Sequence, residues 1–112
     1  MSVIKGYVSA LDTADYRRLD TLQKIQAFDN VVGIVLNTAT TEEEWNAVYD
    51  EVFGGKIGDA AKAILTETGM AQPDYYDPDT TYREDVLAWA GPMREAMQQY
   101  AEGRRKIMAM MD

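Results

Sequence analysis

The sequence of 112 residues contains no cysteine and no histidine. Without cysteine the chain can form no disulfide, thiolate nucleophile or Cys-ligated zinc or iron–sulfur site. Without histidine it lacks the commonest general base and the commonest transition-metal ligand. Catalysis would have to use carboxylates, Lys, Tyr, Ser or Thr, so we expect a protein that is not an enzyme. We expect no catalytic residue, no cofactor and no metal.

Long apolar segments are also absent. The longest apolar run covers residues 31–36, whereas a membrane-spanning helix needs about 20 such residues. Residues 1–10 lack the charged start, apolar middle and cleavage site of a signal peptide. We therefore expect a cytoplasmic protein that has no membrane partner. A single helical domain over residues 1–112 is expected, because domains usually contain about 100 to 150 residues.

Basic residues are fewer than acidic ones, and the excess of acid is local. The chain has 11 Lys and Arg against 19 Asp and Glu, a net charge of −8, and residues 41–85 hold twelve acids against three basic residues, a net charge of −9. Phosphate binding requires a basic surface, so we expect no direct binding of nucleic acid. The acidic segment predicts contact with a basic surface on a protein partner, or a solvated face that keeps the protein soluble.

Helical patterning dominates what is present. Apolar residues recur at spacings of three and four, which is typical of an amphipathic helix, at Leu19, Leu22, Ile25, Phe28, Val32 and Val35. Residues 30–37 are ambiguous, because their β-branched side chains could also form a buried strand. We predict a helix there. The alternative is an α+β fold with a small sheet made from residues 3–8 and 31–36.

Capping residues and glycines predict where the next helices begin and end. Overlapping capping-box patterns in residues 40–44 predict the start of a helix. We expect that helix to end at Gly54 and Gly55 in the left-handed conformation that glycine favours. A further helix is expected over about residues 57–68, with Gly69 as its stop.

The C-terminal third begins at another capping box, formed by Thr81 and Glu84. Its apolar periodicity is interrupted at Gly91 and Pro92, where proline removes a backbone donor, so we expect a kink or two abutting helices. The predicted fold class is all-α: a single compact bundle of four to six helices, with the last helix kinked at Gly91-Pro92.

Acidic and aromatic residues together suggest a binding surface. The loop after residue 70 is no EF-hand, because counting from Asp77 places Tyr82 and Ala88 where Gly and Glu are required. Tyrosine is enriched where proteins bind each other, and carboxylates beside aromatic rings can contact Arg and Lys by ion pairs and cation-π stacking. We expect a partner-binding surface composed of Glu42, Glu43, Asp50, Glu51, Asp74, Tyr75, Tyr76, Asp77, Asp79 and Tyr82.

Spaced carboxylates can occupy a groove that is built for phosphates. In size and charge the chain is similar to small acidic inhibitors encoded by phages and other mobile elements, such as antirestriction and anti-CRISPR proteins. This similarity of composition implies a competitive inhibitor, or nucleic-acid mimic, that occupies a basic cleft on a protein partner. The alternatives are a carboxylate-based enzyme and a structural or accessory subunit of a larger assembly or homo-oligomer. Adaptable apolar surface for such an assembly could come from Met93, Met97, Met108, Met110 and Met111.

Overall fold

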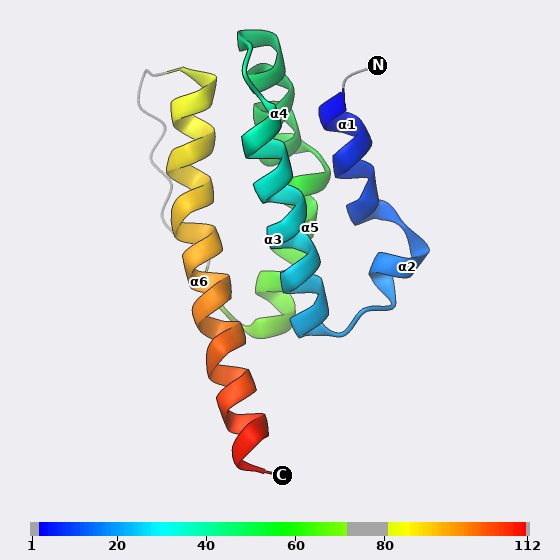
Figure 1. Ribbon diagram of the computed structural model, residues 1–112, viewed down its shortest axis with the longest axis vertical. Coiled ribbons are helices and arrows are strands. Elements are labelled where there is room, and N and C mark those ends of the chain that lie inside the picture. Colours follow the sequence, from blue (N-terminus) through cyan, green and yellow to red (C-terminus); the bar gives the residue numbers. More distant parts are fainter. Residues whose placement is uncertain (1–2, 72–80, 112) are drawn as a thin grey trace.

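The computed structural model describes residues 3–71 and 81–111, and these form helices and no strand. The helices pack as a bundle (Figure 1), in the order α1 (Val3–Val8), the 3-10 helix η1 (Ser9–Asp12), α2 (Ala14–Arg17), α3 (Thr21–Thr38), α4 (Glu42–Gly54), α5 (Lys56–Thr68) and α6 (Tyr82–Met110). The all-α prediction is confirmed. The small-sheet alternative is not supported, because residues 3–8 and 31–36 both lie in helices. No described helix is both long and apolar enough to cross a membrane.

Reciprocal capping boxes fix the starts of α3 and α4. At α3 the Asp20 carboxylate accepts from the Gln23 amide at 2.8 Å, and the Gln23 side chain accepts from the Asp20 amide at 3.2 Å. At α4 the Thr41 hydroxyl accepts from the Glu44 amide at 3.1 Å, and the Glu44 carboxylate accepts from the Thr41 amide at 3.1 Å. Each box satisfies backbone donors that a helix start leaves without an intrahelical partner. The predicted helix start in residues 40–44 is therefore confirmed, with Thr41 as the cap.

The glycine junction between α4 and α5 differs from the prediction. Gly55 has φ −129° and ψ −150°, which is extended backbone, so the expected left-handed ending at Gly54 and Gly55 is wrong. Close approach explains Gly55 instead, since a Cβ there would lie 2.9 Å from the Glu51 Cα atom. Gly58 is required for the same reason, because its Cβ would collide with the Val52 carbonyl oxygen, whereas a Cβ on Gly54 would meet nothing within 4 Å. Gly69, at the end of α5, has φ +72° and is the stop that the sequence predicts.

The core forms where α1, α3, α4, α5 and α6 meet. Phe28 on α3 and Val86 on α6 are fully buried, and two of the methionines of α6, Met93 and Met97, are each only 1% exposed. These methionines fill the core and supply no surface, contrary to the expectation above, whereas Met108, Met110 and Met111 are exposed. Burying a large apolar side chain contributes about 1.5 to 3 kcal/mol to the stability of the fold. Burial in this shared core is therefore the main contribution that holds the helices together.

The last helix runs through Gly91-Pro92 as one α-helix, so it does not divide into two abutting helices. Pro92 lies on the exposed side of α6, where water can satisfy the carbonyl that loses its intrahelical donor. A partly buried ion pair holds this helix to α3, with 2.6 Å between Arg94 Nε and Asp29 Oδ1. Gly33 leaves room for the pair, since a Cβ there would lie 3.3 Å from the Arg94 guanidinium.

Candidate functional site

Helices α4 and α6 begin at the same end of the bundle (Figure 1). An open groove lies between their first turns, lined by Glu42, Trp45, Thr81, Tyr82, Arg83 and Glu84. A smaller hollow lined by Glu42, Glu43, Asn46 and Tyr82 adjoins it. We call this surface, formed by residues 42–46 and 81–84, the acidic end.

Helix capping accounts for part of the charge at the acidic end. Acidic side chains are favourable in the first turn of a helix, where the helix dipole is positive. Glu44 has this role: hydrogen bonds from the backbone of Thr41 and Thr40, together with their hydroxyl groups, hold the pKa of its carboxyl below the usual value. Its carboxylate is therefore directed to its own helix start and is a capping group.

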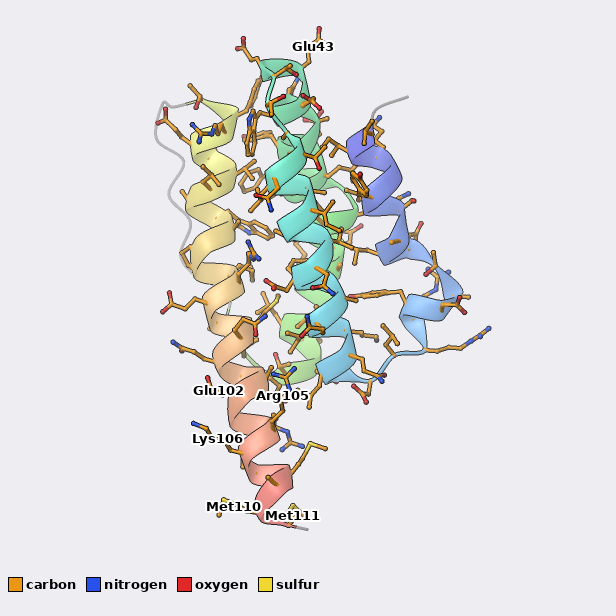
Figure 2. All side chains as sticks on the ribbon, in the orientation of Figure 1. Glu43, Glu102, Arg105, Lys106, Met110 and Met111 are labelled. Atoms are coloured by element: carbon orange, nitrogen blue, oxygen red, sulfur yellow. The ribbon has the colours of Figure 1, made fainter. Side chains whose placement is uncertain are left out.

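Two further carboxylates of the same turn have no such role. Glu42 and Glu43 are exposed, and no described residue forms a hydrogen bond or an ion pair with either of them. Figure 2 shows Glu43 pointing away from the bundle at its tip. These two charges remain available to a partner.

A chain of aromatic rings supports the groove from inside. The ring of Tyr82 lies 5.0 Å from that of Tyr49, which lies 4.7 Å from Phe53, and Phe53 meets Trp89 edge-on at 6.3 Å. Such tilted and edge-to-face pairs are favourable aromatic geometries. Tyr82 is nevertheless 40% exposed. One side of its ring is thus held by α4 while the other faces the groove.

The groove already holds one cation against an aromatic ring. The guanidinium carbon of Arg83 lies 5.9 Å from the centre of the Trp45 ring, which is 8% exposed. This distance is within the range of a cation-π contact. A guanidinium group therefore already contacts an aromatic ring that lines the groove.

The structure brings together three of the predicted site residues, Glu42, Glu43 and Tyr82. Asp50 is exposed on the same face of α4 as Glu43, two helical turns further along. Glu51 points elsewhere: its carboxylate accepts from the Lys56 amide at 3.0 Å and joins α4 to α5. The remaining predicted residues lie outside the part of the chain that the structure describes: Asp74, Tyr75, Tyr76, Asp77 and Asp79.

Sequence reasoning missed the contributions of Arg83 and Trp45 to this site. They are 38 positions apart in the chain, and Trp45 fits the buried stripe of its helix, so no local pattern connects them. The sequence offers one related signal: Thr41 and Thr81 each predict a helix start, and in the structure these two starts lie at the same end of the bundle.

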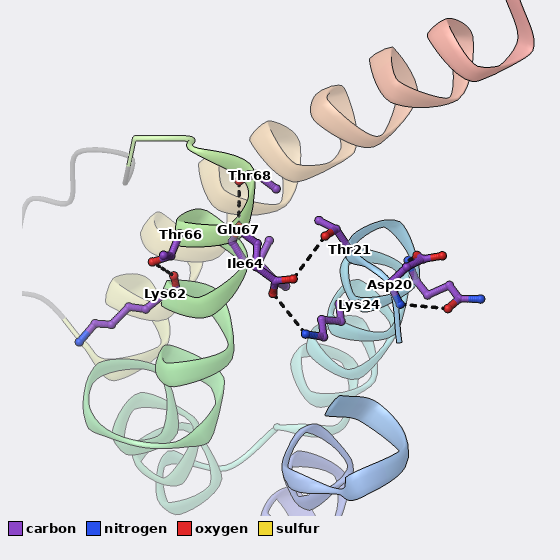
Figure 3. A network of polar contacts seen from close by, with 9 residues as sticks. Asp20, Thr21, Lys24, Lys62, Ile64, Thr66, Glu67 and Thr68 are labelled. Atoms are coloured by element: carbon purple, nitrogen blue, oxygen red, sulfur yellow. Dashed lines mark hydrogen bonds and ion pairs between the residues drawn. The ribbon is translucent and has the colours of Figure 1, made fainter. Parts of the chain in front are cut away.

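A second polar cluster joins α3 to α5 (Figure 3). The Glu67 carboxylate accepts from Thr21 Oγ1 and from Lys24 Nζ, both at 3.3 Å. Nearby, the buried Tyr16 hydroxyl has no hydrogen-bond partner among the described residues. Burial, and secondarily the charge of Glu67, raise the pKa of Tyr16 to about 12. The Glu67 contacts tie α3 to α5, and the Tyr16 hydroxyl forms no hydrogen bond with Glu67 or with any other described residue, so we interpret this cluster as structural.

Among the residues that the structure describes, no three carboxylates come close enough to hold a metal ion. Comparisons of the chain with protein-family models, curated proteins and solved structures found no match. We therefore infer function from the geometry and charge of the acidic end.

Proposed function

We propose that this chain is a small acidic protein-binding module that acts in the cytoplasm and has no catalytic activity. Its acidic end occupies a basic cleft on a protein partner, as a competitive inhibitor or nucleic-acid mimic does. The observation that carries the proposal is the pair of exposed carboxylates Glu42 and Glu43, which form no ion pair or hydrogen bond with a described residue and lie beside the supported ring of Tyr82.

The carboxylates are spaced to act on one cationic surface. Glu43 and Asp50 are seven residues apart on one helix face, which corresponds to about 10 Å along the axis. That separation is close to the Debye length of about 8 to 10 Å in physiological salt. Charges arranged in this way steer a basic partner toward the surface and accelerate its association.

The aromatic groove adds a contact that charge alone does not provide. An arginine from the partner can pair with Glu42 while its guanidinium plane stacks on Tyr82, because arginine combines planar hydrogen bonding with aromatic stacking. The existing contact of Arg83 with Trp45 is an intramolecular example of the same geometry. This combination favours a protein partner rich in exposed arginine.

The test is affinity capture with the wild-type chain, followed by binding kinetics with the captured protein. Changing both Glu42→Lys and Glu43→Lys should slow association and weaken the dependence of affinity on salt. Glu95→Lys is the control for a change of charge elsewhere, half as large as in the double variant, since Glu95 is an exposed carboxylate of α6 outside the acidic end.

The Tyr82 ring should affect the dissociation rate of the complex, whereas the two carboxylates affect the association rate. Tyr82→Ala should mainly raise the dissociation rate, with a loss of roughly 1 to 3 kcal/mol if the ring is a buried anchor in the complex. Unchanged affinity and unchanged salt dependence in the Glu42 and Glu43 variant would show that the acidic end is only a solvated face.

A further inference from the structure

The C-terminal part of α6 extends beyond the rest of the bundle (Figure 1). Ala101 is the last buried residue of this helix, and every described residue after it is exposed. We call residues 102–111 the overhang; its helical part, residues 102–110, corresponds to a length of about 14 Å. Figure 2 shows it at the opposite tip of the molecule from Glu43.

The overhang continues the apolar face of the buried part of α6. Spacings of three and four lead from Met97 through Ala101 and Arg104 to Ile107, Met108 and Met111. Inside the bundle this face is covered, but in the overhang Ile107 and Met108 are about half exposed and Met111 is 81% exposed. Met110, on the neighbouring side, is 84% exposed. An exposed apolar group of this kind on a helix is typical of a contact surface.

The charge of the overhang is opposite to that of the chain. It carries Arg104, Arg105 and Lys106 against Glu102, whereas the whole chain has a net charge of −8. Lys106 pairs with Glu102 at 3.5 Å, and no described residue forms an ion pair with Arg104 or Arg105. Among the described residues, these two guanidinium groups and the carboxylates of Glu42 and Glu43 are thus charges of opposite sign at opposite ends of the molecule that have no ion-pair partner.

We infer that the overhang docks on the acidic end of a second copy of this chain, head to tail. The inference rests on the proposed binding role of the acidic end and names a partner for it. Arg104 and Arg105 would face Glu42 and Glu43, and the terminal methionines would enter the groove beside Tyr82. The negative end of the α6 dipole would also approach the positive starts of α4 and α6 in the second copy.

Electrostatics favours this contact over a symmetric one. If two overhangs paired antiparallel, the basic segments 104–106 of both copies would lie side by side and repel each other. In the head-to-tail contact the two surfaces differ, so the pair of copies as a whole still has one free overhang and one free acidic end. Such a heterologous contact can add further copies.

Sedimentation velocity of the full chain over a range of concentrations tests the inference. In about 0.15 M salt the Debye length is about 8 Å, so local charges outweigh the net charge of the molecule. We expect the average mass to rise with concentration, and the dissociation constant to increase at least about tenfold in about 1 M salt, where the Debye length is about 3 Å.

Blocked variants then identify the two surfaces. One variant carries Glu42→Lys and Glu43→Lys, with Glu42→Gln and Glu43→Gln as a milder version that puts no positive charge at a helix start. The other carries Arg104→Glu and Arg105→Glu. Each blocked variant should be monomeric alone, with circular dichroism unchanged. An equimolar mixture of the Gln version and the Arg104→Glu, Arg105→Glu variant should form a species of two chains and nothing larger, because only one pair of intact surfaces remains. The Lys version is left out of this mixture, because its reversed charges would complement those of the other variant.

Several results would overturn the inference. The wild-type chain could stay monomeric at every concentration, or an acidic-end variant could associate like the wild type, which would indicate symmetric pairing of overhangs. Sedimentation of the monomeric chain with anionic vesicles, abolished by the Arg104 and Arg105 changes, would show that a lipid surface covers the overhang. In each of these cases the Glu42→Lys, Glu43→Lys variant could still bind the captured partner more weakly than the wild-type chain does. The proposed function would then stand although the self-association is disproved.

Discussion

Replacing Tyr16 with Phe is expected to stabilise the bundle, although it deletes a polar group. The Tyr16 hydroxyl is buried and has no hydrogen-bond partner among the described residues. In water the same hydroxyl would be fully hydrogen-bonded, so folding loses those bonds without replacement. Phe keeps the ring and its packing against the core and removes only this unfavourable contribution.

The expected gain in stability follows from the free-energy cost of burying a polar group without a hydrogen-bond partner. Mutational data put that cost at about 1 to 3 kcal/mol. The Tyr16 side chain is only partly buried, so we expect the lower end, about 1 kcal/mol, which corresponds to about 4 °C in melting temperature for a domain of this size. Urea and thermal unfolding followed by circular dichroism measure both values. Tyr7→Phe is the control: Tyr7 is 39% exposed, so its change should stay within about 0.5 kcal/mol.

The pH dependence provides an independent check. The pKa of Tyr16 is raised from 10.0 to about 12 in the folded state. The stability linked to this shift is fully present below pH 10 and is lost as the pH rises toward 12. The wild type should therefore lose stability over that window more steeply than Tyr16→Phe does. Two results together would refute this reasoning: Tyr16→Phe destabilises the protein by about 1 kcal/mol or more, and the stabilities of the wild type and the variant fall equally with pH. They would indicate that a bound water satisfies the Tyr16 hydroxyl.

Three further substitutions test the helix junctions, each measured by urea unfolding. Gly58→Ala should destabilise by more than about 2 kcal/mol, because the added Cβ meets the Val52 carbonyl oxygen; a neutral result would contradict the close approach of α4 and α5. Thr41→Ala should cost about 1 kcal/mol. It should also lessen the loss of stability below pH 4.5, since Thr41 helps to lower the pKa of Glu44 and that contribution is lost as the carboxyl is protonated. Gly91→Ala should stabilise by about 1 kcal/mol, because its Cβ meets nothing within 4 Å; destabilisation would indicate that α6 requires flexibility there.

Local signals predicted the helices well. The capping residues Thr41 and Thr81 and the stop at Gly69 act through neighbouring backbone groups, so the sequence contains all the information they need. Residues 31–36 were ambiguous because their side chains suit either a strand or a helix. In the structure Val32 and Val35 are buried while Ile34 is 45% exposed, which is a helical and not an alternating pattern.

Features that depend on distant contacts could not be predicted. Met97 and Met108 fit the same periodic stripe of α6, yet one is buried and the other exposed, because only the neighbouring helices determine where the bundle stops. The sequence likewise indicated Glu42, Glu43 and Tyr82 as acidic and aromatic residues. It did not indicate that two helix starts enclose a groove, or that Arg83 lies against Trp45.

Chemical-shift mapping tests the central claim most directly. Isotope-labelled chain would be titrated with the captured protein partner, and the backbone amide shifts followed by NMR. We predict that the largest changes occur in residues 42–46 and 81–84, and that they diminish when salt is raised. Changes confined to residues 102–111, or to a face remote from both helix starts, would contradict the assignment of the acidic end as the binding surface.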